Sequence, residues 1–142
     1  MIEAGTIKFF LLLLIKVAIF LSPLDVHVNW VPCAGVVEDI IYHKGSFYPA
    51  FLPKASELNE RNDVVIRSTH GSVLRMRQIT GTIAQTIVCW VKKEQRVQAG
   101  DTFGMMKFGS RIDLFLPKEV NIIVQEKDRV RGGETVIAQW KL

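Results

Sequence analysis

The dipeptide Gly109-Ser110 is the part of this sequence best suited to chemistry on its own backbone. A serine hydroxyl can attack the carbonyl before it, and glycine favours the attack because it has no Cβ and tolerates a strained conformation. The peptide bond then becomes an ester, and β-elimination splits the chain and leaves dehydroalanine. Hydrolysis of that group produces a pyruvoyl cap on residue 110. Gly-Ser pairs are also common in ordinary turns, so this pattern alone does not decide between the two roles.

His27 is the second candidate, as a general acid or base. It follows the turn-like residues 22–25, and imidazole is the side chain best suited to proton transfer near pH 7. A lone histidine in a strand is nevertheless more often structural. His43 and His70 lie beside glycine-containing turns, and we assign them no role. The three histidines are far apart and no G-x-S-x-G motif is present, so we expect neither a metal site nor a serine hydrolase.

Two copies of one sequence pattern flank the dipeptide. They span residues 91–103 and 124–136, offset by 33 residues. The coinciding pairs are Val91/Val124, Arg96/Arg129, Val97/Val130, Gly100/Gly133, Asp101/Glu134 and Thr102/Thr135. Such self-similarity predicts two equivalent supersecondary units, with a glycine allowing a tight reversal in each. The spacing resembles the halves of biotinyl and lipoyl carrier domains, where a modified residue lies in the hairpin between the halves. We therefore expect the chemistry at the turn between the copies.

The composition is that of a single globular domain. The chain has 142 residues, of which 49% are hydrophobic and 23% charged, and this excludes a disordered protein. The net charge of +4 suits an anionic membrane, whereas the scattered basic residues and the lack of a base-stacking motif argue against a nucleic-acid partner. Cys33 and Cys89 have no metal-binding or redox spacing, so we expect them to be reduced, buried and inert.

The hydrophobic pattern predicts a mainly β fold, a flattened sandwich or barrel of short strands. Residues 36–42 predict a strand, and residues 64–79 predict a hairpin with its turn at His70-Gly71. The C-terminal half is expected to follow the biotinyl/lipoyl-like arrangement of two repeats. Apolar residues 9–21 are interrupted by Lys16 and are too few to span a bilayer as a helix. They predict a short membrane-adherent or buried N-terminal helix that runs into a strand from Val17 onward, with membrane insertion and signal cleavage as alternatives.

Several motifs occur together in an order that is typical of one family. They are Phe20-Leu-Ser-Pro-Leu-Asp-Val-His-Val-Asn29, Tyr42-His-Lys-Gly45, Ala50-Phe-Leu52 with Asn59-Glu-Arg-Asn62, Ile87-Val-Cys-Trp90 and Phe108-Gly-Ser-Arg-Ile-Asp113. Together they resemble phosphatidylserine decarboxylases of the short bacterial and archaeal type, over about residues 17–139. The first and last motifs carry most of this resemblance.

The resemblance implies a self-cleaving proenzyme that forms a single domain over residues 1–142. Its β chain would be residues 1–109, and its α chain, residues 110–142, would begin with a pyruvoyl cofactor made from Ser110. The implied reaction is decarboxylation of phosphatidylserine to phosphatidylethanolamine, with His27 assisting decarboxylation or protonation. The implied location is peripheral, on the cytoplasmic side of the cell membrane. The resemblance leaves homo-oligomerisation open.

Two departures from the family pattern keep alternative functions open. The family usually carries an upstream Pro-x-Asp-Gly element, whose aspartate is thought to assist self-cleavage. This sequence does not contain it, so we expect a chain shortened at its N-terminus. Trp30 stands where the family commonly has arginine. One alternative is an inactive, membrane-adherent remnant of the enzyme. Another is a carrier or binding module of biotinyl/lipoyl type, for which Lys107 in a Met-Lys pair would be the acceptor.

Overall fold

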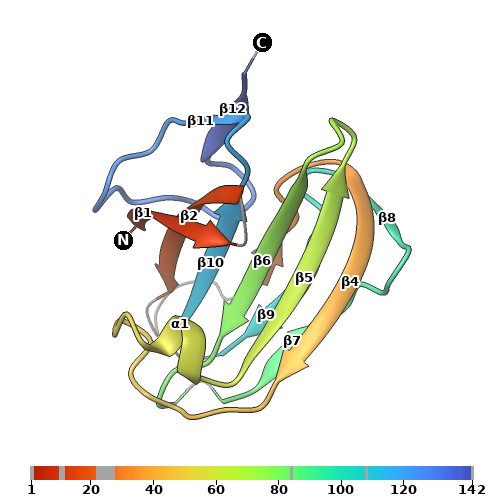
Figure 1. Ribbon diagram of the computed structural model, residues 1–142. Coiled ribbons are helices and arrows are strands. Elements are labelled where there is room, and N and C mark those ends of the chain that lie inside the picture. The colour runs from red at the N-terminus through yellow and green to blue at the C-terminus, as the bar shows by residue number, and fades with distance from the viewer. Residues whose placement is uncertain (1, 10–11, 22–27, 84, 108, 142) are drawn as a thin grey trace.

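Strands make up most of the molecule. The computed structural model describes residues 2–9, 12–21, 28–83, 85–107 and 109–141 of the chain. The strands are β1 (Ile2–Phe9), β2 (Leu12–Leu21), β3 (Val28–Trp30), β4 (Gly35–His43), β5 (Arg61–Ser68), β6 (Val73–Ile79), β7 (Ile87–Cys89), β8 (Arg96–Val97), β9 (Thr102–Met106), β10 (Ser110–Leu116), β11 (Val120–Ile122) and β12 (Ala138–Trp140). A short helix, α1 (Ala55–Leu58), lies between β4 and β5 (Figure 1). The prediction of a mainly β fold is confirmed.

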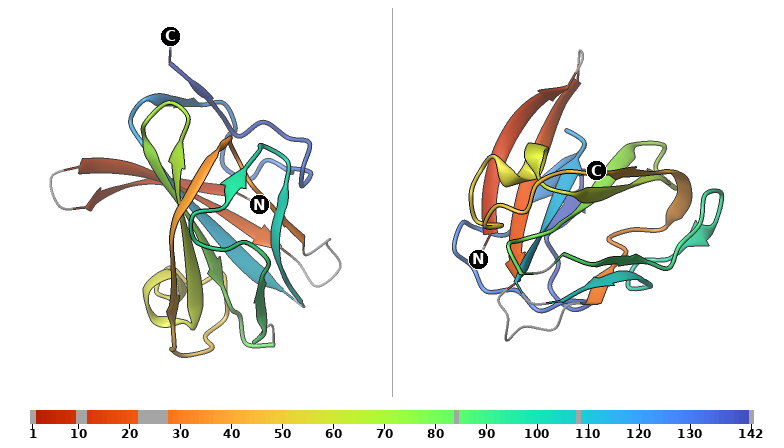
Figure 2. Two further views of the ribbon diagram at one scale, coloured as in Figure 1. Left: turned by 90° about the vertical axis from the view of Figure 1, so that its right-hand side faces the viewer. Right: turned by 90° about the horizontal axis from the view of Figure 1, so that it is seen from below.

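A seven-stranded antiparallel sheet is the frame of the molecule. Its strand order is β1-β2-β10-β6-β5-β4-β8. A three-stranded sheet, β3-β9-β7, lies behind it, and the pair β11-β12 lies beyond one end (Figures 1 and 2). None of these sheets closes on itself within the described residues, so the fold there is a sandwich of open sheets, not a barrel.

Strand β10 lies near the centre of the large sheet, between β2 and β6, and is buried on both faces. Side chains alternate along a strand. Ile112, Leu114 and Leu116 therefore join the apolar core between the sheets, whereas Arg111 and Asp113 point to the opposite face. The neighbouring strands β5 and β6 follow the same alternation. The large sheet thus has one apolar face and one face that carries buried charge.

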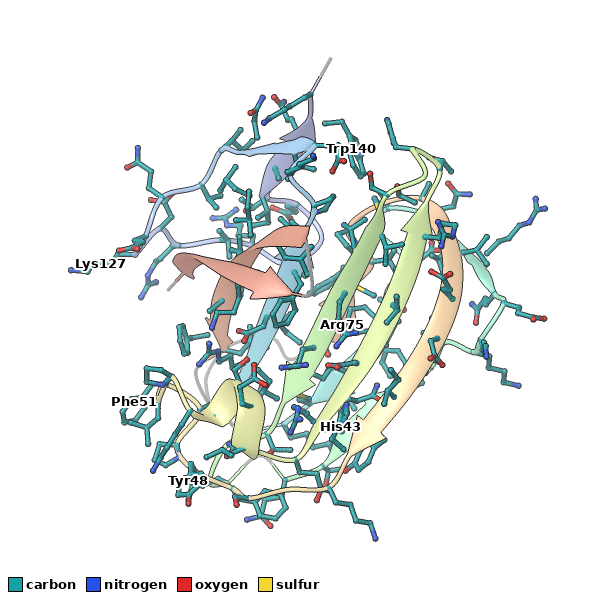
Figure 3. The ribbon with its side chains drawn as sticks, in the orientation of Figure 1. His43, Tyr48, Phe51, Arg75, Lys127 and Trp140 are labelled. Carbon is teal, nitrogen blue, oxygen red and sulfur yellow. The ribbon has the colours of Figure 1, made fainter. Side chains whose placement is uncertain are left out.

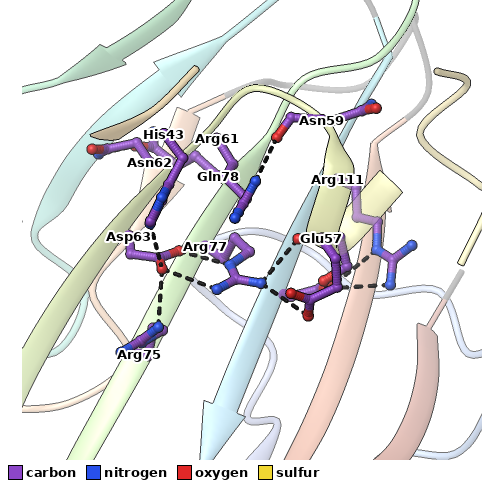
Figure 4. Close-up of polar contacts among 12 residues, drawn as sticks. His43, Glu57, Asn59, Arg61, Asn62, Asp63, Arg75, Arg77, Gln78 and Arg111 are labelled. Atoms are coloured by element: carbon purple, nitrogen blue, oxygen red, sulfur yellow. Dashed lines mark hydrogen bonds and ion pairs between the residues drawn. The ribbon is translucent and has the colours of Figure 1, made fainter. Parts of the chain in front are cut away.

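The charged face is organised around Asp63, whose carboxylate is fully buried beside α1 (Figure 4). Arg77 donates to this carboxylate from Nε at 2.7 Å and from Nη2 at 3.0 Å, and Arg75 donates from Nη1 at 3.1 Å. The remaining Arg77 Nη1 donates to the carbonyl of Ser56 in α1 at 2.9 Å. The ion pairs therefore attach the helix to the sheet and satisfy charges that would be costly to bury alone.

The predicted hairpin over residues 64–79 is confirmed. β5 and β6 pair from Arg61 with Ile79 to Arg67 with Val73. Gly71 in the connecting turn has a φ of 86°, which is a conformation that glycine adopts without steric cost. The strand predicted at residues 36–42 is also confirmed, as β4.

The prediction of an N-terminal helix is wrong. Residues 2–9 and 12–21 form β1 and β2, and β2 also pairs with β10 from Ile15 opposite Leu116 to Leu21 opposite Ser110. In β2, Ile15, Val17 and Ile19 pack on the core at a spacing of two residues, and their β-branched side chains suit a pleated strand. The edge of β10 offers the backbone partners that a sequence taken alone does not reveal. Within the described residues, no helix is long and apolar enough to cross a bilayer.

The two sequence repeats share their turns but not their strands. Glu94 and Lys127 occupy equivalent positions and have φ values of 73° and 70°. Gly100 and Gly133 are likewise equivalent, with φ values of 87° and 74°. Residues 96–97 form strand β8, however, whereas residues 129–130 form no strand. The repeated sequence therefore dictates local chain reversals, while strand pairing depends on the partner that each copy meets.

Replacing Asp63 with alanine should lower the free energy of unfolding by about 3 kcal/mol, because Arg77 would be left buried without its counter-charge. Glu38→Ala is the matched control, since it removes the exposed ion pair between Glu38 and Arg67, whose N–O distance is 2.8 Å. We expect that control to cost less than about 1 kcal/mol. Urea unfolding followed by tryptophan fluorescence measures both variants. Equal, small losses would contradict a structural role for the Asp63 network.

Candidate active site

Ser110 is the first residue of β10, at the end of the strand that meets Leu21 of β2. Its side chain is on the apolar face with Ile112, and the residue is only 2% exposed. Its hydroxyl has no hydrogen-bond partner among the described residues. A buried, unpartnered hydroxyl is destabilising by about 1–3 kcal/mol, and Ser68 is the other serine in the described chain whose hydroxyl is in this state.

The carbonyl of Gly109 lies close to Gly81, where there is no room for a side chain. The φ of Gly109 is 69°, in the left-handed region. On the facing segment, a Cβ added to Gly81 would lie 2.7 Å from the Gly109 carbonyl oxygen and 3.4 Å from the Cβ of Ala50. Two glycines thus let the backbone pack closely around the bond between residues 109 and 110. Glycine adopts the φ seen at Gly109 without steric cost, so the strained carbonyl expected beside the serine stays a prediction.

Gly109 and Ser110 line a cavity of about 1210 Å³ between the large sheet and the C-terminal segment. Much of its wall is apolar. Its members include Ile19, Leu21, Ile112, Leu114, Val120 and Ile137. The ring of Trp30 also lines the cavity and packs so closely on the C-terminal segment that a Cβ on Gly132 would lie 2.0 Å from it. The cavity is large enough for a small-molecule or lipid ligand.

Arg111, which follows Ser110, holds the start of β10 from the other face of the sheet. Its guanidinium donates to Asp113 from Nε at 2.7 Å and from Nη2 at 3.2 Å (Figure 4). Its Nη1 donates to the carbonyl of Leu52 at 3.2 Å, and its Cζ lies 5.1 Å from the ring centroid of Phe20. Because both Arg111 and Asp113 are fully buried, these contacts restrain the start of β10 strongly.

A buried amide network ties β3 to the large sheet near Ser110. Gln78 Nε2 donates to Asn29 Oδ1 at 2.9 Å, and Asn62 Nδ2 donates to Gln78 Oε1 at 3.0 Å. Gln78 stands opposite Ile112, which is two residues after Ser110 on the same face. Asn29 belongs to the motif that contains His27, so the network holds the described end of that motif close to the cavity.

The histidines, Lys107 and the two cysteines were also singled out in the sequence. His27 lies outside the described residues, and its role stays a prediction. His43 Nε2 lies 3.6 Å from Asp63 Oδ2, and the ring of His70 stacks on Trp140 with centroids 4.2 Å apart. Lys107 is exposed directly after β9. Cys33 and Cys89 are free thiols that are half-buried, and burial raises the pKa of the Cys33 thiol, which disfavours its reactive thiolate.

The structural roles of several residues were not found from the sequence, although Asn62, Arg111 and Asp113 stand in the family motifs. Gly81 looked like an ordinary turn glycine, and nothing around it indicates that its neighbour in space is Gly109. Gln78 and Asn62 interrupt apolar strands, which is a weak signal of a buried polar network. The alternation of Arg111 and Asp113 with apolar residues was visible, but it is equally typical of a solvent-facing strand edge.

Comparisons with known proteins agree with the motifs. The model of the phosphatidylserine decarboxylase family matches residues 12–138. Curated relatives named phosphatidylserine decarboxylase proenzyme include one from Syntrophus aciditrophicus, 48% identical over 88% of this chain and 59% of its own length. Another, from Carboxydothermus hydrogenoformans, is 48% identical over 89% of this chain and 60% of its own. A third, from Saccharopolyspora erythraea, is 44% identical over 87% and 52%.

The chain therefore spans between about half and three fifths of the curated relatives it matches. No solved structure gives a significant match. Since the family model covers most of the chain and includes the cavity residues around Gly109 and Ser110, the protein belongs to the phosphatidylserine decarboxylase family.

Proposed function

We propose that this protein is a self-cleaving proenzyme that decarboxylates phosphatidylserine to phosphatidylethanolamine. The observation that carries the proposal is the state of Ser110. Its hydroxyl is buried, has no partner among the described residues, and follows a glycine in the left-handed conformation at the wall of a large apolar cavity. The names of the relatives, which are proenzymes of this decarboxylase, support the same activity.

Self-cleavage would begin with attack of Ser110 Oγ on the carbonyl carbon of Gly109. The bond from that carbon to the Ser110 nitrogen breaks, and the nitrogen takes up a proton as the ester forms. Loss of the Ser110 α-proton and cleavage of the bond between Oγ and Cβ release the Gly109 carboxylate and leave dehydroalanine. Tautomerisation to an imine and hydrolysis by water release ammonia and leave a pyruvoyl group on residue 110. The paired glycines 81 and 109 favour the first step because they leave the carbonyl accessible.

The residues around Ser110 fit a pyruvoyl group, since the buried hydroxyl from which it forms already faces the cavity. When present, that group supplies the electron sink needed for loss of carbon dioxide. The apolar wall would hold acyl chains and exclude water from the substrate carboxylate, which favours its loss as neutral carbon dioxide. Arg111 and Asp113 would hold residue 110 in place after the chain is cut, because their contacts do not involve the severed bond.

His27 is proposed to assist decarboxylation or to protonate the product carbon. Support comes from Asn29, two residues later, which the amide network holds beside Gln78 near the cavity.

We also propose that residues 91–136 are the paired halves of a biotinyl/lipoyl-like arrangement, supported by their equivalent left-handed turns. A peripheral location on the cytoplasmic face of the cell membrane stays a prediction, as do the division into chains at residue 109 and the oligomeric state.

Ser110→Ala should abolish splitting of the chain, because no hydroxyl remains to attack Gly109. The unaltered protein should run on a denaturing gel as fragments of residues 1–109 and 110–142. Mass spectrometry should show that the smaller fragment begins with a keto group and not with an amine. A single intact mass for the unaltered protein would contradict self-cleavage and favour the inactive remnant. A mass gain on Lys107 after co-expression with a biotin or lipoate ligase would favour the carrier function.

Gly81→Ala should slow splitting by about tenfold or more, equivalent to about 1.4 kcal/mol in the barrier. The new Cβ would lie 2.7 Å from the Gly109 carbonyl oxygen and must displace it. Thr82→Ala is the control, since Thr82 is an exposed neighbour on the same segment and its truncation adds no atom near the bond. The rate is measured by following the intact band after synthesis in a cell-free system. Equal rates for the two variants would show that the close approach of Gly81 and Gly109 is irrelevant to the reaction.

His27→Ala should lower the release of carbon dioxide from phosphatidylserine micelles by about a hundredfold or more, as expected for a lost proton donor. Splitting of the same variant should be affected much less. Both are measured on one preparation, with His70→Ala as the control because His70 stacks on Trp140. Parallel loss of splitting and turnover would refute this division of roles.

A further inference from the structure

We propose that the end of the molecule carrying Phe51 and Ile83 docks on an anionic lipid bilayer and passes lipid to the cavity at Ser110. This proposal rests on the proposed function, because it assigns the route by which a lipid substrate reaches that site. Phe51 is 67% exposed and Ile83 is 72% exposed, the highest values among the large apolar side chains recorded as exposed. Both residues also line the cavity that contains Gly109 and Ser110.

The two exposed side chains come from segments that meet at the reactive bond. Ala50 precedes Phe51, and its Cβ lies 3.4 Å from the position of a Cβ on Gly81. That same position is 2.7 Å from the Gly109 carbonyl oxygen. Phe51 and Ile83, which we call the apolar rim, are therefore continuous with the end of the cavity that contains Ser110. A lipid leaving a bilayer at this rim would keep its acyl chains in apolar surroundings throughout.

Other apolar side chains extend the rim beyond these two residues. Tyr48 is on the same connection as Phe51, and both project outward near α1 (Figure 3). Leu58 on α1 is also exposed. Single exposed apolar residues are normal, whereas several on one end of a molecule indicate an interaction site.

The charge of the rim favours an anionic surface as its partner. The segments that meet at Gly109 are parts of residues 44–56, 80–83 and 104–107 with their neighbours, and these ranges contain Lys44, Lys54 and Lys107 but no aspartate or glutamate. The Lys54 ammonium lies 4.0 Å from the centroid of the Tyr48 ring, so cation and aromatic group are presented together. Each lysine near an anionic membrane contributes about 1 kcal/mol of attraction. An aromatic and aliphatic rim flanked by lysines is thus suited to the interface of a bilayer.

Two acidic side chains, Glu57 and Glu60, follow the first of these segments. Glu57 pairs with Arg77 at 3.3 Å, so its charge is offset within the protein. Glu60 accepts a hydrogen bond from the neutral hydroxyl of Tyr42 and keeps its charge. The three lysines still outnumber this one carboxylate.

The test is sedimentation with phosphatidylglycerol vesicles, which are anionic but do not contain the proposed substrate. All variants carry Ser110→Ala, so every protein is intact and self-cleavage cannot influence the result. Phe51→Ser combined with Ile83→Ser should weaken vesicle binding by about tenfold or more, because two large apolar side chains no longer enter the membrane. Ile123→Ser combined with Trp90→Ser is the matched control, since these residues are 49% and 47% exposed and are not part of the rim. It should change binding less than twofold.

Replacing phosphatidylglycerol with phosphatidylcholine should also weaken binding of the parent protein. Equal binding by the rim and control variants, or equal binding to both lipids, would overturn the proposal. A dimer in gel filtration that the Phe51→Ser and Ile83→Ser substitutions separate, with vesicle binding unchanged, would also overturn the proposal. Failure of the proposed function would appear separately, as an unaltered chain that binds vesicles but does not split.

Discussion

The buried ion pair on one face of β10 restrains the position of Ser110, whose side chain is on the other face. Arg111 and Asp113 are fully buried, and losing either partner would leave an uncompensated charge at a cost of several kcal/mol. Arg111 also donates to the backbone of the loop that precedes α1. Since Ser110 is adjacent to Arg111 on the same strand, its position is restrained by contacts that it does not make itself. A strand paired on both sides and buried on both faces is a rigid support for a reactive terminus.

The apolar face carries few buried polar side chains, and not all of them are satisfied. The amides of Asn29, Asn62 and Gln78 hydrogen-bond to one another, whereas the buried hydroxyls of Ser68 and Ser110 have no partner among the described residues. Beside Ser110, Gly109 adopts a conformation that disfavours other residues, and Gly81 allows close packing. Unsatisfied groups of this kind persist where the surrounding fold is stable enough to hold them.

The sequence predicted the elements whose signals are local. The hairpin of β5 and β6 followed from alternation and a turn glycine, and the motif around Ser110 indicated both the reactive bond and the family. The prediction of an N-terminal helix was wrong because the apolar pattern of residues 9–21 suits either a buried strand or a helix. The pairing of residues 15–21 with β10 decided the outcome for that part of the chain. The network of Asn29, Gln78 and Asn62 could not be predicted, since Asn29 and Gln78 are separated by 49 residues.

By itself the sequence determined which groups can react and where the chain must reverse. Residue type makes Ser110 a possible nucleophile, and the positive φ angles at Gly71, Gly100 and Gly133 are local conformations that glycine adopts without steric cost. Only the tertiary structure decided that the serine hydroxyl is buried without a partner, that Gly81 faces Gly109, and that the apolar rim is continuous with the cavity. These properties depend on strand register and on the packing of distant segments, because burial and close contact are relations between residues that the order of the chain does not specify.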